Sequence, residues 1–522
     1  MAKYIFVTGG VMSSLGKGII SSSIGLILKS MGYKVSMLKF DPYLNVDAGS
    51  MNPYQHGEVF VTKDGGEVDL DIGHYERFLS EDLSKANNTT SGSIYKTIIE
   101  KERKGEYLGQ TIQVVPHLTD EIISRIKELL KKDNSEIIVV EIGGTVGDIE
   151  SLPFLEAASE LKNQEKEVFF FHVTYVPYLD ITEELKTKPT QHSVKELRSI
   201  GIYPDVLFLR GKKEIKESEK DKLFRYLGIP KERIISVIDL NSHYFVPELL
   251  LNSKIKEILE ELFNEKRDID ISSWKNFTSK LNKSEKVKKI GILGKYIELK
   301  DAYISLKEAL IHSQVETKTK IETTWISAED LKNLEKNINE VEGVIIPGGF
   351  GKRGIEGMIE GAKICRLSKK PLLGICLGLQ IIIIEFFRNV VGLNDSNSTE
   401  FDEKTSNPII DLLSSQRDIK FLGGTMHLGE SELIIKENTK AYEIYKRIFT
   451  KERHRHRYTF NLSYLDILEK NGMLISGRSR DGEVEIIELK EHPFYIGVQF
   501  HPEFSSKPLY PHPLFSSFIK SL

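Results

Sequence analysis

The chain has 522 residues, of which 40% are hydrophobic and 28% charged, and its formal net charge is −4. These values exclude a disordered chain and a single small domain, and they predict a globular protein of several domains. The slightly negative charge argues against a general nucleic-acid-binding surface. Only two cysteines occur, Cys365 and Cys376, which excludes a disulfide framework and favours the reducing cytoplasm.

No segment is expected to cross a membrane. The most apolar window, LGLQIIIIEFF at residues 377–387, is interrupted by Glu385 and is too short to span a bilayer. The N-terminal stretch MAKYIFVTGG is typical of a short strand entering a glycine loop, not of a secretion signal. We therefore expect a cytoplasmic protein.

The first half of the chain alternates apolar runs with amphipathic segments. The runs are YIFVT (4–8), KVSMLKF (34–40), EIIVVEIGG (136–144), EVFFFHVTYV (167–176) and DVLFLRG (205–211). Continuous apolar runs separated by helical segments are typical of strands buried on both faces of a parallel sheet. This half is therefore predicted to form a doubly wound α/β domain.

A glycine loop, GGVMSSLGKGI at residues 9–19, follows the first predicted strand. It differs from the common phosphate-binding pattern G-x-x-x-x-G-K-[ST] in two places. Five residues separate Gly10 from Gly16, and Gly18 stands where a metal-binding hydroxyl usually follows Lys17. Backbone N–H groups, a helix N-terminus and a lysine still provide what a polyphosphate needs. A plain turn is the alternative interpretation.

Two acids are placed where such a ligand would need them. Glu141 closes the apolar run IIVV, and Asp71 lies in GGEVDLDIGHYERF. Carboxylates at the carboxyl ends of parallel strands lie where open α/β sheets bind ligands, and Mg²⁺ on phosphates uses one or two carboxylates. Solvated strand-end charges are the alternative. The polar stretches GGTVGDIES (143–151) and KTKPTQHS (186–193), with the segment around Lys220, indicate either surface loops or a second polyphosphate site.

Around residues 265–288 the sequence becomes charged and without clear periodicity, which indicates a linker. A second strand-and-helix series begins at KIGILGKY (289–296) and ends near FYIGVQFHPEF (494–504). We therefore predict two α/β domains, at residues 1–265 and 289–522, joined by a linker at 266–288.

The second domain contains G-x-C-x-G at Gly374, Cys376 and Gly378. This pattern is typical of a sharp strand-to-helix turn that exposes a nucleophile, whose thiolate a helix N-terminus and an imidazolium would favour. A buried structural cysteine is the alternative, and Cys365 fits that description. In VQFHPEF, His501 can serve as base and Glu503 can orient it, on one side of the chain if the backbone stays extended there.

The oxyanion of such a centre is expected to meet backbone N–H groups of Leu377 and Gly349. The stretch RHRHRY at residues 453–458 contains a His-x-His pair, a spacing that metal sites use. No third ligand cluster accompanies this pair in the sequence, so we do not expect a metal there.

Five segments of the first half, in order, resemble the CTP synthase family. They are YIFVTGGVMSSLGKGI, FDPYLNVDAGSMNPYQHGEVFV, DGGEVDLDIGHYERF, EIGGTVGDIESLPF and KTKPTQHSVKELR. The glycine loop resembles the variant P-loop of amidoligases related to dethiobiotin synthetase, and the second half resembles class I glutamine amidotransferases to its C-terminus. The resemblance implies an N-terminal P-loop NTPase-like domain and a C-terminal glutaminase.

The resemblance also implies residue roles. Catalysis of glutamine hydrolysis falls to Cys376, His501 and Glu503, and Mg²⁺ to Asp71 and Glu141. The implied ATP contacts are Ser14, Leu15, Gly16, Lys17, Gly18, Ile19, Lys39, Asp71, Asp239 and Leu240. The implied UTP and CTP contacts are Ser13, Asp148, Ile149, Glu150, Lys186, Thr187, Lys188, Pro189, Thr190, Gln191 and Lys220. The implied glutamine contacts are Gly349, Leu377, Gly378, Leu379, Gln380, Glu400 and Arg457.

The implied reaction is amination of UTP to CTP, with ATP activating the 4-oxygen of UTP and glutamine supplying ammonia. The family resemblance further implies Mg²⁺ but no organic cofactor, activation by GTP, inhibition by CTP, an internal ammonia passage, and homotetramers that can form filaments. Neither nucleic acid nor membrane is expected as a partner.

Two other functions remain open from the sequence. One is a different amidoligase, for example one that amidates a cobalamin precursor, against which the second set of lysines argues. The other is a nucleotide switch or filament protein with an inert glutaminase half, against which the intact Cys376, His501 and Glu503 argue.

Overall fold

The computed structural model describes residues 2–52, 56–284, 286–295, 297, 300–413, 416 and 426–522. Residue 285 of the predicted linker and residues 53–55 of one family motif lie outside this part. The chain divides into two compact units, one of residues 1–47 and 71–278 and one of residues 48–70 and 279–522. Among the described residues, no helix combines the length and apolar character needed to cross a bilayer.

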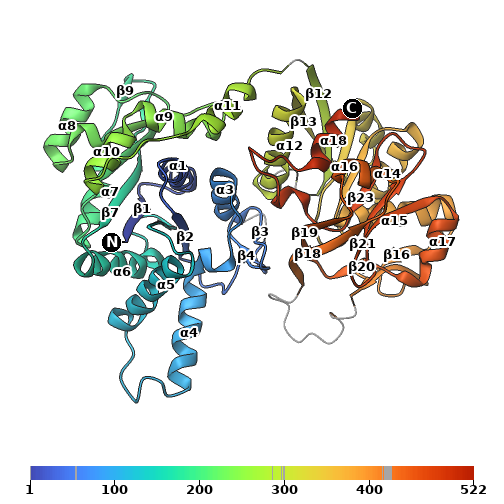
Figure 1. The fold of residues 1–522 in the computed structure, drawn as a ribbon, viewed down its shortest axis with the longest axis horizontal. Coiled ribbons are helices and arrows are strands. Elements are labelled where there is room, and N and C mark those ends of the chain that lie inside the picture. Colours follow the sequence, from blue (N-terminus) through green and yellow to red (C-terminus); the bar gives the residue numbers. More distant parts are fainter. Residues whose placement is uncertain are drawn as a thin grey trace. The chain divides into compact units, whose positions relative to one another are not determined.

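The N-terminal unit is built on a seven-stranded sheet with the order β11-β10-β7-β1-β6-β2-β5, in which every neighbouring pair is parallel (Figure 1). Its strands are β1 (Lys3–Gly9), β2 (Val35–Asp41), β5 (Asn88–Thr90), β6 (Ile137–Ile142), β7 (Val168–Tyr175), β10 (Val206–Gly211) and β11 (Ile234–Ile238). Its longer helices are α1 (Lys17–Ser30), α3 (Leu70–Leu79), α4 (Ser91–Arg103), α5 (Thr119–Lys132), α6 (Leu152–Gln164), α7 (Lys188–Ser199), α8 (Glu217–Leu227), α9 (Val246–Asn252), α10 (Ile255–Phe263) and α11 (Ser272–Leu281).

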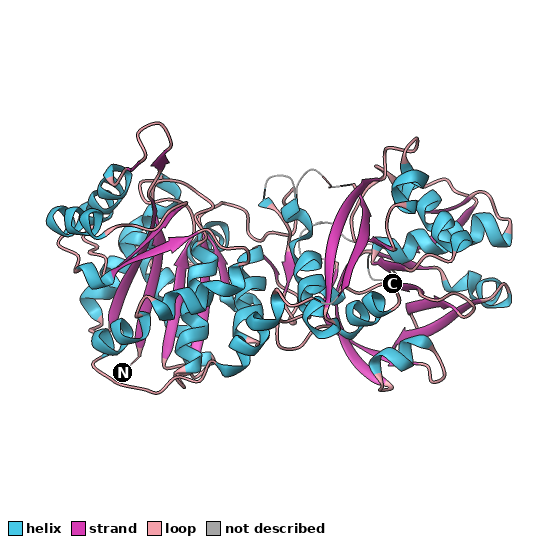
Figure 2. Ribbon diagram, turned by 90° about the horizontal axis from the view of Figure 1, so that it is seen from above, coloured by secondary structure: helices cyan, strands magenta, loops and turns pink. Residues whose placement is uncertain are grey.

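Helices cover both faces of this sheet (Figure 2), and the alternation of side chains along β2 shows why. Leu38 belongs to a buried cluster with Ile126 of α5 and Leu155 of α6. The neighbouring Met37 faces the other side, where its sulfur lies so near Gly25 of α1 that a Cβ there would come within 2.8 Å. Successive strand residues point to opposite faces, so both faces must be covered to bury such apolar runs. The predicted doubly wound α/β fold is confirmed.

The C-terminal unit contains a nine-stranded sheet with the order β13-β12-β14-β15-β23-β22-β21-β18-β19. The first five strands pair in parallel, whereas β23, β22, β21, β18 and β19 pair antiparallel. The strands are β12 (Lys286–Gly294), β13 (Thr319–Ser327), β14 (Gly343–Ile346), β15 (Leu372–Ile375), β18 (His427–Ile435), β19 (Phe449–His456), β21 (Met473–Ser479), β22 (Val484–Leu489) and β23 (Tyr495–Val498). The helices are α12 (Ile304–Thr317), α13 (Leu334–Asn339), α14 (Ile355–Ser368), α15 (Leu377–Phe386), α16 (Lys440–Tyr445), α17 (Leu465–Lys470) and α18 (Pro513–Lys520).

Two segments differ from what the sequence indicated. The predicted linker contains α11, in which Trp274 is buried and donates from Nε1 to the Tyr244 carbonyl at 3.0 Å. Residues 48–70, which precede the Asp71 motif, belong to the C-terminal unit and carry the short antiparallel pair β3 (Phe60–Val61) and β4 (Glu67–Val68).

Candidate active sites

The glycine loop joins β1 to the first turn of α1. Gly16 has a φ of 81° and precedes the helix, and Ser14 has a φ of 58°. Positive φ values turn successive backbone N–H groups toward one side, which is how such loops hold phosphate oxygens. The loop is therefore a strained connection built on the carboxyl end of a central strand.

The side chain of Lys17 lies folded back across this loop. Its Nζ donates to the Gly144 carbonyl at 2.6 Å, and a Cβ on Gly9 would lie 2.7 Å from the Lys17 Cδ. Burial lowers the pKa of Lys17, and the carboxylate of Glu141 acts in the opposite direction. Gly9 thus leaves the space through which the lysine reaches the sheet edge.

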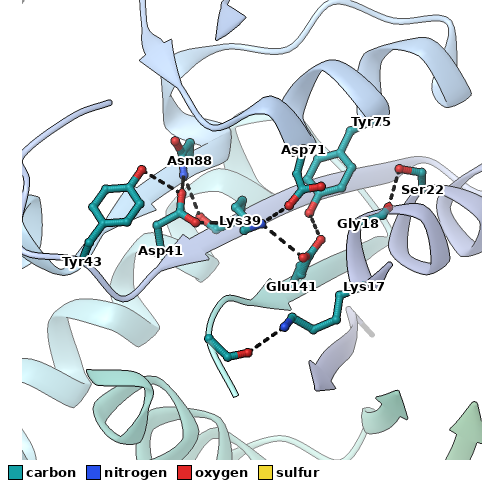
Figure 3. Close-up of polar contacts among 11 residues, drawn as sticks. Lys17, Gly18, Ser22, Lys39, Asp41, Tyr43, Asp71, Tyr75, Asn88 and Glu141 are labelled. Atoms are coloured by element: carbon teal, nitrogen blue, oxygen red, sulfur yellow. Dashed lines mark hydrogen bonds and ion pairs between the residues drawn. The ribbon is translucent and has the colours of Figure 1, made fainter. Parts of the chain in front are cut away.

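Lys39, Asp71 and Glu141 form an ion cluster beside the loop (Figure 3). Lys39 on β2 is paired in register with Glu141 on β6, and its Nζ lies 3.2 Å from the Glu141 Oε1. Asp71, in the first turn of α3, accepts a hydrogen bond from the same ammonium, and Tyr75 donates to Glu141. The structure therefore brings together two predicted metal ligands and a predicted phosphate-binding lysine.

The electrostatics of the two carboxylates differ. Burial alone would raise the pKa of Asp71, but the Lys39 ammonium holds it below its usual value. Burial and the Asp71 charge raise the pKa of Glu141. Two close carboxylates offer oxygen ligands alone, which suit a hard cation such as Mg²⁺. Such a cation would compensate the negative charge that Lys39 compensates here.

The same cluster explains the unusual Gly18. A Cβ at residue 18 would lie 2.0 Å from the Asp71 Oδ1, so no side chain fits there while Asp71 points at the loop. The carboxylate of Asp71 thus occupies the space in which the common loop places its hydroxyl.

The predicted adenine residues lie beside the loop. Asp239 and Leu240 line a cavity of about 280 Å³ together with Gly16, Ile19 and Arg210. The Arg210 guanidinium donates to the Asp239 Oδ1 at 2.9 Å. Arg210 was not predicted, although its position at the end of the strand DVLFLRG would have indicated it.

The predicted UTP residues are less closely connected. Asp148 accepts from the Thr145 N–H at 2.8 Å and lies near enough to Lys17 to affect its pKa. Ser13 and Ile149 are exposed, and Thr187 precedes α7, which contains Lys188 to Gln191. Lys186 pairs with Glu184, and Lys220 on α8 pairs with Glu217 at 3.0 Å. The described contacts do not join Lys220 to the other members of this group.

A buried histidine behind the loop was not predicted. His172 on β7 lies 2.8 Å from the Thr8 hydroxyl through Nδ1 and 2.8 Å from the Ser193 hydroxyl through Nε2. Burial lowers the pKa of His172 to about 3. This network ties β1, β7 and α7 together, and its only sequence signal is a histidine inside the apolar run VFFFHV.

The candidate nucleophile of the C-terminal unit, Cys376, lies between β15 and α15 with φ 51° and ψ −99°. This is a rare backbone conformation for a residue other than glycine and indicates stored strain. Its N–H donates to the Val498 carbonyl at 2.7 Å, and its Sγ lies 3.7 Å from the Arg455 carbonyl. The predicted strand-to-helix elbow is present.

Glycines make the elbow possible because each allows a close approach. A Cβ on Gly374 would lie 2.6 Å from the backbone of Gly378, and one on Gly378 would lie 2.2 Å from the Ile346 carbonyl oxygen. A Cβ on Gly348 would meet the His501 ring at 2.7 Å. The elbow, the strand β14 and the histidine are therefore packed in direct contact.

His501 and Glu503 form a hydrogen-bonded pair, with Nδ1 2.7 Å from Oε1. The backbone is not extended as expected, because residues Pro502–Phe504 form a 3₁₀ turn, which brings the carboxylate to the ring. Burial would lower the pKa of His501, but the Glu503 carboxylate and the Cys376 thiol raise it to about 10. The His501 ring therefore interacts with the carboxylate of Glu503 and with the side chain of Cys376.

One cavity connects these groups. Cys376, His501 and Glu503 line it with Gly348, Gly349 and Phe350, so the predicted oxyanion glycine lies at the nucleophile. The remaining lining residues were not predicted. Phe504 directly follows Glu503, whereas the others come from distant parts of the sequence: Glu58, Val59, Ala302, Tyr303 and Arg455.

The other predicted glutamine contacts are not among the residues that line this cavity. Leu377, Gly378, Leu379 and Gln380 form the first turn of α15, and Gln380 donates to the Tyr458 carbonyl at 3.1 Å. Glu400 accepts from the Gly351 N–H at 2.6 Å, and Arg457 donates to Gln416 at 2.9 Å. Lys295, which was not predicted, donates to the Gly351 carbonyl at 2.6 Å and so supports the same loop.

The His-x-His pair has a neighbour that the sequence did not indicate. His427, His454 and His456 each place one ring nitrogen within 4.8 Å of the others, and they are the one such group of three among the described residues. Burial, with the neighbouring imidazoles, lowers the pKa of His456 to about 3 and that of His454 well below its usual value. The expectation that no third ligand accompanies the pair is wrong.

Comparisons with known proteins identify the family of each half of the chain. The family described as CTP synthase N-terminus matches residues 3–264, and glutamine amidotransferase class-I matches residues 298–521. The CTP synthase of Hydrogenobaculum sp. (strain Y04AAS1) is 53% identical over 524 residues, which cover 100% of this chain and 97% of that protein. The CTP synthase of Aquifex aeolicus (strain VF5) is 51% identical over 525 residues, with 100% and 98% coverage. The CTP synthase of Pyrococcus furiosus is 50% identical over 527 residues, which cover 100% of this chain and 98% of that protein. The chain therefore belongs to the CTP synthase family.

Proposed function

We propose that this chain catalyses the reaction ATP + UTP + L-glutamine + H₂O → ADP + phosphate + CTP + L-glutamate, a carbon–nitrogen ligation in pyrimidine biosynthesis. The observation that carries the proposal is the presence, in one chain of this family, of two different chemical centres. One is a cysteine elbow with a His–Glu pair, and the other is a glycine loop beside a lysine and two carboxylates.

The Cys376 centre performs the glutaminase step. The Cys376 sulfur attacks the glutamine amide carbon, and His501 holds the thiol proton and passes it to the departing ammonia. Glu503 holds the ring in place at 2.7 Å. The developing oxyanion is stabilised by the N–H groups of Leu377 and Gly349. Water then releases glutamate. Glutamine is held by Gly349, Leu377 to Gln380, Glu400 and Arg457.

The glycine-loop centre performs the activation step. The γ-phosphoryl group moves from ATP to the 4-oxygen of UTP. Ammonia then adds to the ring carbon that bears this oxygen, and the carbon–oxygen bond breaks to release phosphate and CTP. Lys17 and Lys39 hold the phosphates, and Asp239 and Leu240 the adenine. Asp71 and Glu141 would hold Mg²⁺, which would neutralise charge on the transferred phosphoryl group.

The UTP site is assigned to Ser13, Asp148 to Glu150, Lys186 to Gln191 and Lys220. We propose the same set for CTP as a feedback inhibitor, together with activation by GTP and a homotetramer in the cytoplasm. The proposed division is a synthase domain at 1–265, a connecting segment at 266–288 and a glutaminase domain at 289–522. The family ranges 3–264 and 298–521 support these bounds.

The test is conversion of UTP to CTP with ATP and Mg²⁺, followed by absorbance, with glutamine and with ammonium in parallel. Product from both nitrogen sources is the expected result. Product from ammonium alone, even with GTP added, would remove the glutaminase assignment. Hydrolysis of ATP without any CTP would remove UTP as the acceptor and favour a different amidoligase.

A further inference from the structure

Three histidines of the C-terminal unit gather on one face of a strand pair. His427 begins β18, and His454 and His456 lie two residues apart near the end of β19. His427 is directly opposite His456 in the antiparallel register, so all three side chains project to the same face. The ring centroid of His427 lies 4.5 Å from that of His454 and 5.0 Å from that of His456.

The ring nitrogens are arranged as a set of ligands would be. The His456 Nδ1 lies 3.0 Å from the Tyr458 carbonyl, which can only accept, so Nδ1 carries the proton and Nε2 has the lone pair. This Nε2 is 3.2 Å from the His454 Nδ1. Two nitrogens on one tetrahedral metal ion with bonds of about 2.0–2.1 Å are separated by roughly 3.4 Å.

The surroundings contain polar atoms that a cation would satisfy. Glu485 on β22 is 1% exposed, and its Oε2 lies 3.8 Å from the His454 Nδ1. This oxygen has no hydrogen-bond partner in the part of the chain that the structure describes. Buried polar atoms without partners are rare and call for an explanation such as a bound ion.

We infer that His427, His454 and His456 form a binding site for one divalent transition-metal ion of the zinc class. Three imidazole nitrogens suit zinc, cobalt or nickel, whereas Mg²⁺ requires oxygen ligands, so this site is chemically different from the Asp71–Glu141 pair. With such an ion bound, a carboxylate at Glu485 beside His454 would offset part of its charge.

Such an ion would link β18 to β19 next to the glutaminase centre. Arg455 lies between the two β19 histidines and faces the opposite way, where it lines the cavity that contains Cys376. Its carbonyl oxygen lies 3.7 Å from the Cys376 Sγ. The ion would therefore fix the strand whose backbone contacts the nucleophile. The inference does not depend on which nucleotide the other unit uses.

The test is a metal titration of the full-length chain that carries Cys376→Ser. This substitution is needed because a thiol beside His501 is itself a potential zinc ligand. The chain is freed of metal with a chelator and titrated with Co²⁺, whose visible absorption reports tetrahedral nitrogen coordination, and then with Zn²⁺ in competition. We expect one Co²⁺ ion per chain with the visible absorption of tetrahedral nitrogen coordination, and we expect Zn²⁺ to displace it. Failure to bind a stoichiometric ion would overturn the inference.

Variants identify the ligands. His427→Asn and His456→Gln should each weaken binding at least tenfold and change the Co²⁺ spectrum. The matched control is His492→Gln, since His492 is also buried in this unit but its Nε2 contacts the Cys365 carbonyl at 3.2 Å, away from the cluster. His427 is only half-buried at the first residue of its strand, so its variant should fold even if His456→Gln does not. Unchanged binding by His427→Asn would contradict the proposed site.

Discussion

The Arg455 guanidinium donates to the Glu67 carboxylate at 2.9 Å, although the two residues are 388 positions apart in the sequence. The side chains are 14% and 2% exposed. Further contacts attach the same early segment to the C-terminal unit: Arg453 donates to the Val61 carbonyl at 3.0 Å, and Ser305 donates its N–H to Glu58. Residues 48–70 are thus part of the unit that contains Cys376, and Glu58 lines its cavity.

The first prediction concerns this ion pair. Arg455→Met leaves the Glu67 carboxylate buried without its cation, which should lower the free energy of unfolding by about 3–5 kcal/mol. The measurement is urea unfolding followed by circular dichroism. Arg480→Met is the matched control, because its partner Glu432 lies 2.8 Å away on the surface, where the Arg480 side chain is 69% exposed. Equal losses of unfolding free energy in the two variants would show that the buried contact with Glu67 stabilises the protein no more than a surface ion pair does.

The second prediction separates the two cysteines. Cys376→Ala should abolish CTP formation from glutamine and leave formation from ammonium near the parent rate, because the nucleophile and the glycine loop belong to different units. Cys365→Ala is the control: burial raises the pKa of the Cys365 thiol to about 12, so it is not a nucleophile at neutral pH. Parallel rate assays with both nitrogen sources decide the matter. Loss of the ammonium reaction in Cys376→Ala would contradict the separation of roles.

The third prediction concerns Lys17. Lys17→Ala should lower CTP formation from both nitrogen sources by about 10²–10³-fold, because a preorganised charge on the transferred phosphate is lost before either source can react. Lys29→Ala is the control, since Lys29 is on the same helix but in its last turn, paired with Glu81. Ammonium-dependent synthesis by Lys17→Ala at the rate of Lys29→Ala would exclude the phosphate role.

Local sequence patterns predicted what depends on neighbours along the chain. The apolar runs gave the strands of the N-terminal sheet, and G-x-C-x-G gave the elbow at Cys376 because its glycines act within a few residues. The predicted pairing of His501 with Glu503 is present, although a 3₁₀ turn and not an extended strand makes it. Helix α11 lay in a segment judged to lack periodicity, yet Ile271, Trp274 and Leu281 are buried at helical spacing.

What the sequence did not predict depends on partners far away along the chain. His427 joins His456 only through the register of β18 with β19, and Glu67 meets Arg455 only because residues 48–70 belong to the C-terminal unit. Likewise, Gly18 departs from the common loop pattern because Asp71, which is 53 positions away, occupies the space that a side chain would need. Local sequence patterns do not reveal contacts between residues that are so far apart along the chain.

The fourth prediction concerns the pH dependence of stability. Burial lowers the pKa of His172 from about 6.5 in the unfolded chain to about 3 in the folded one. The folded state therefore binds fewer protons than the unfolded state between these values, and stability falls as the pH is lowered through this window. Because of this histidine, the free energy of unfolding should be lower at pH 5 than at pH 7 by about 2 kcal/mol.

Replacing the histidine removes this dependence. His172→Asn loses the hydrogen bonds to Thr8 and Ser193 and should be less stable than the parent at pH 7, but the difference should shrink as the pH falls to 5. Urea unfolding followed by the fluorescence of Trp274, in a Trp325→Phe background, reports on the N-terminal unit. The exposed His192→Asn should follow the parent curve at every pH. If the His172→Asn and parent curves stay parallel between pH 7 and pH 5, the ring takes up a proton as readily in the folded protein as in the unfolded chain, and the buried network that joins β1, β7 and α7 must be assigned differently.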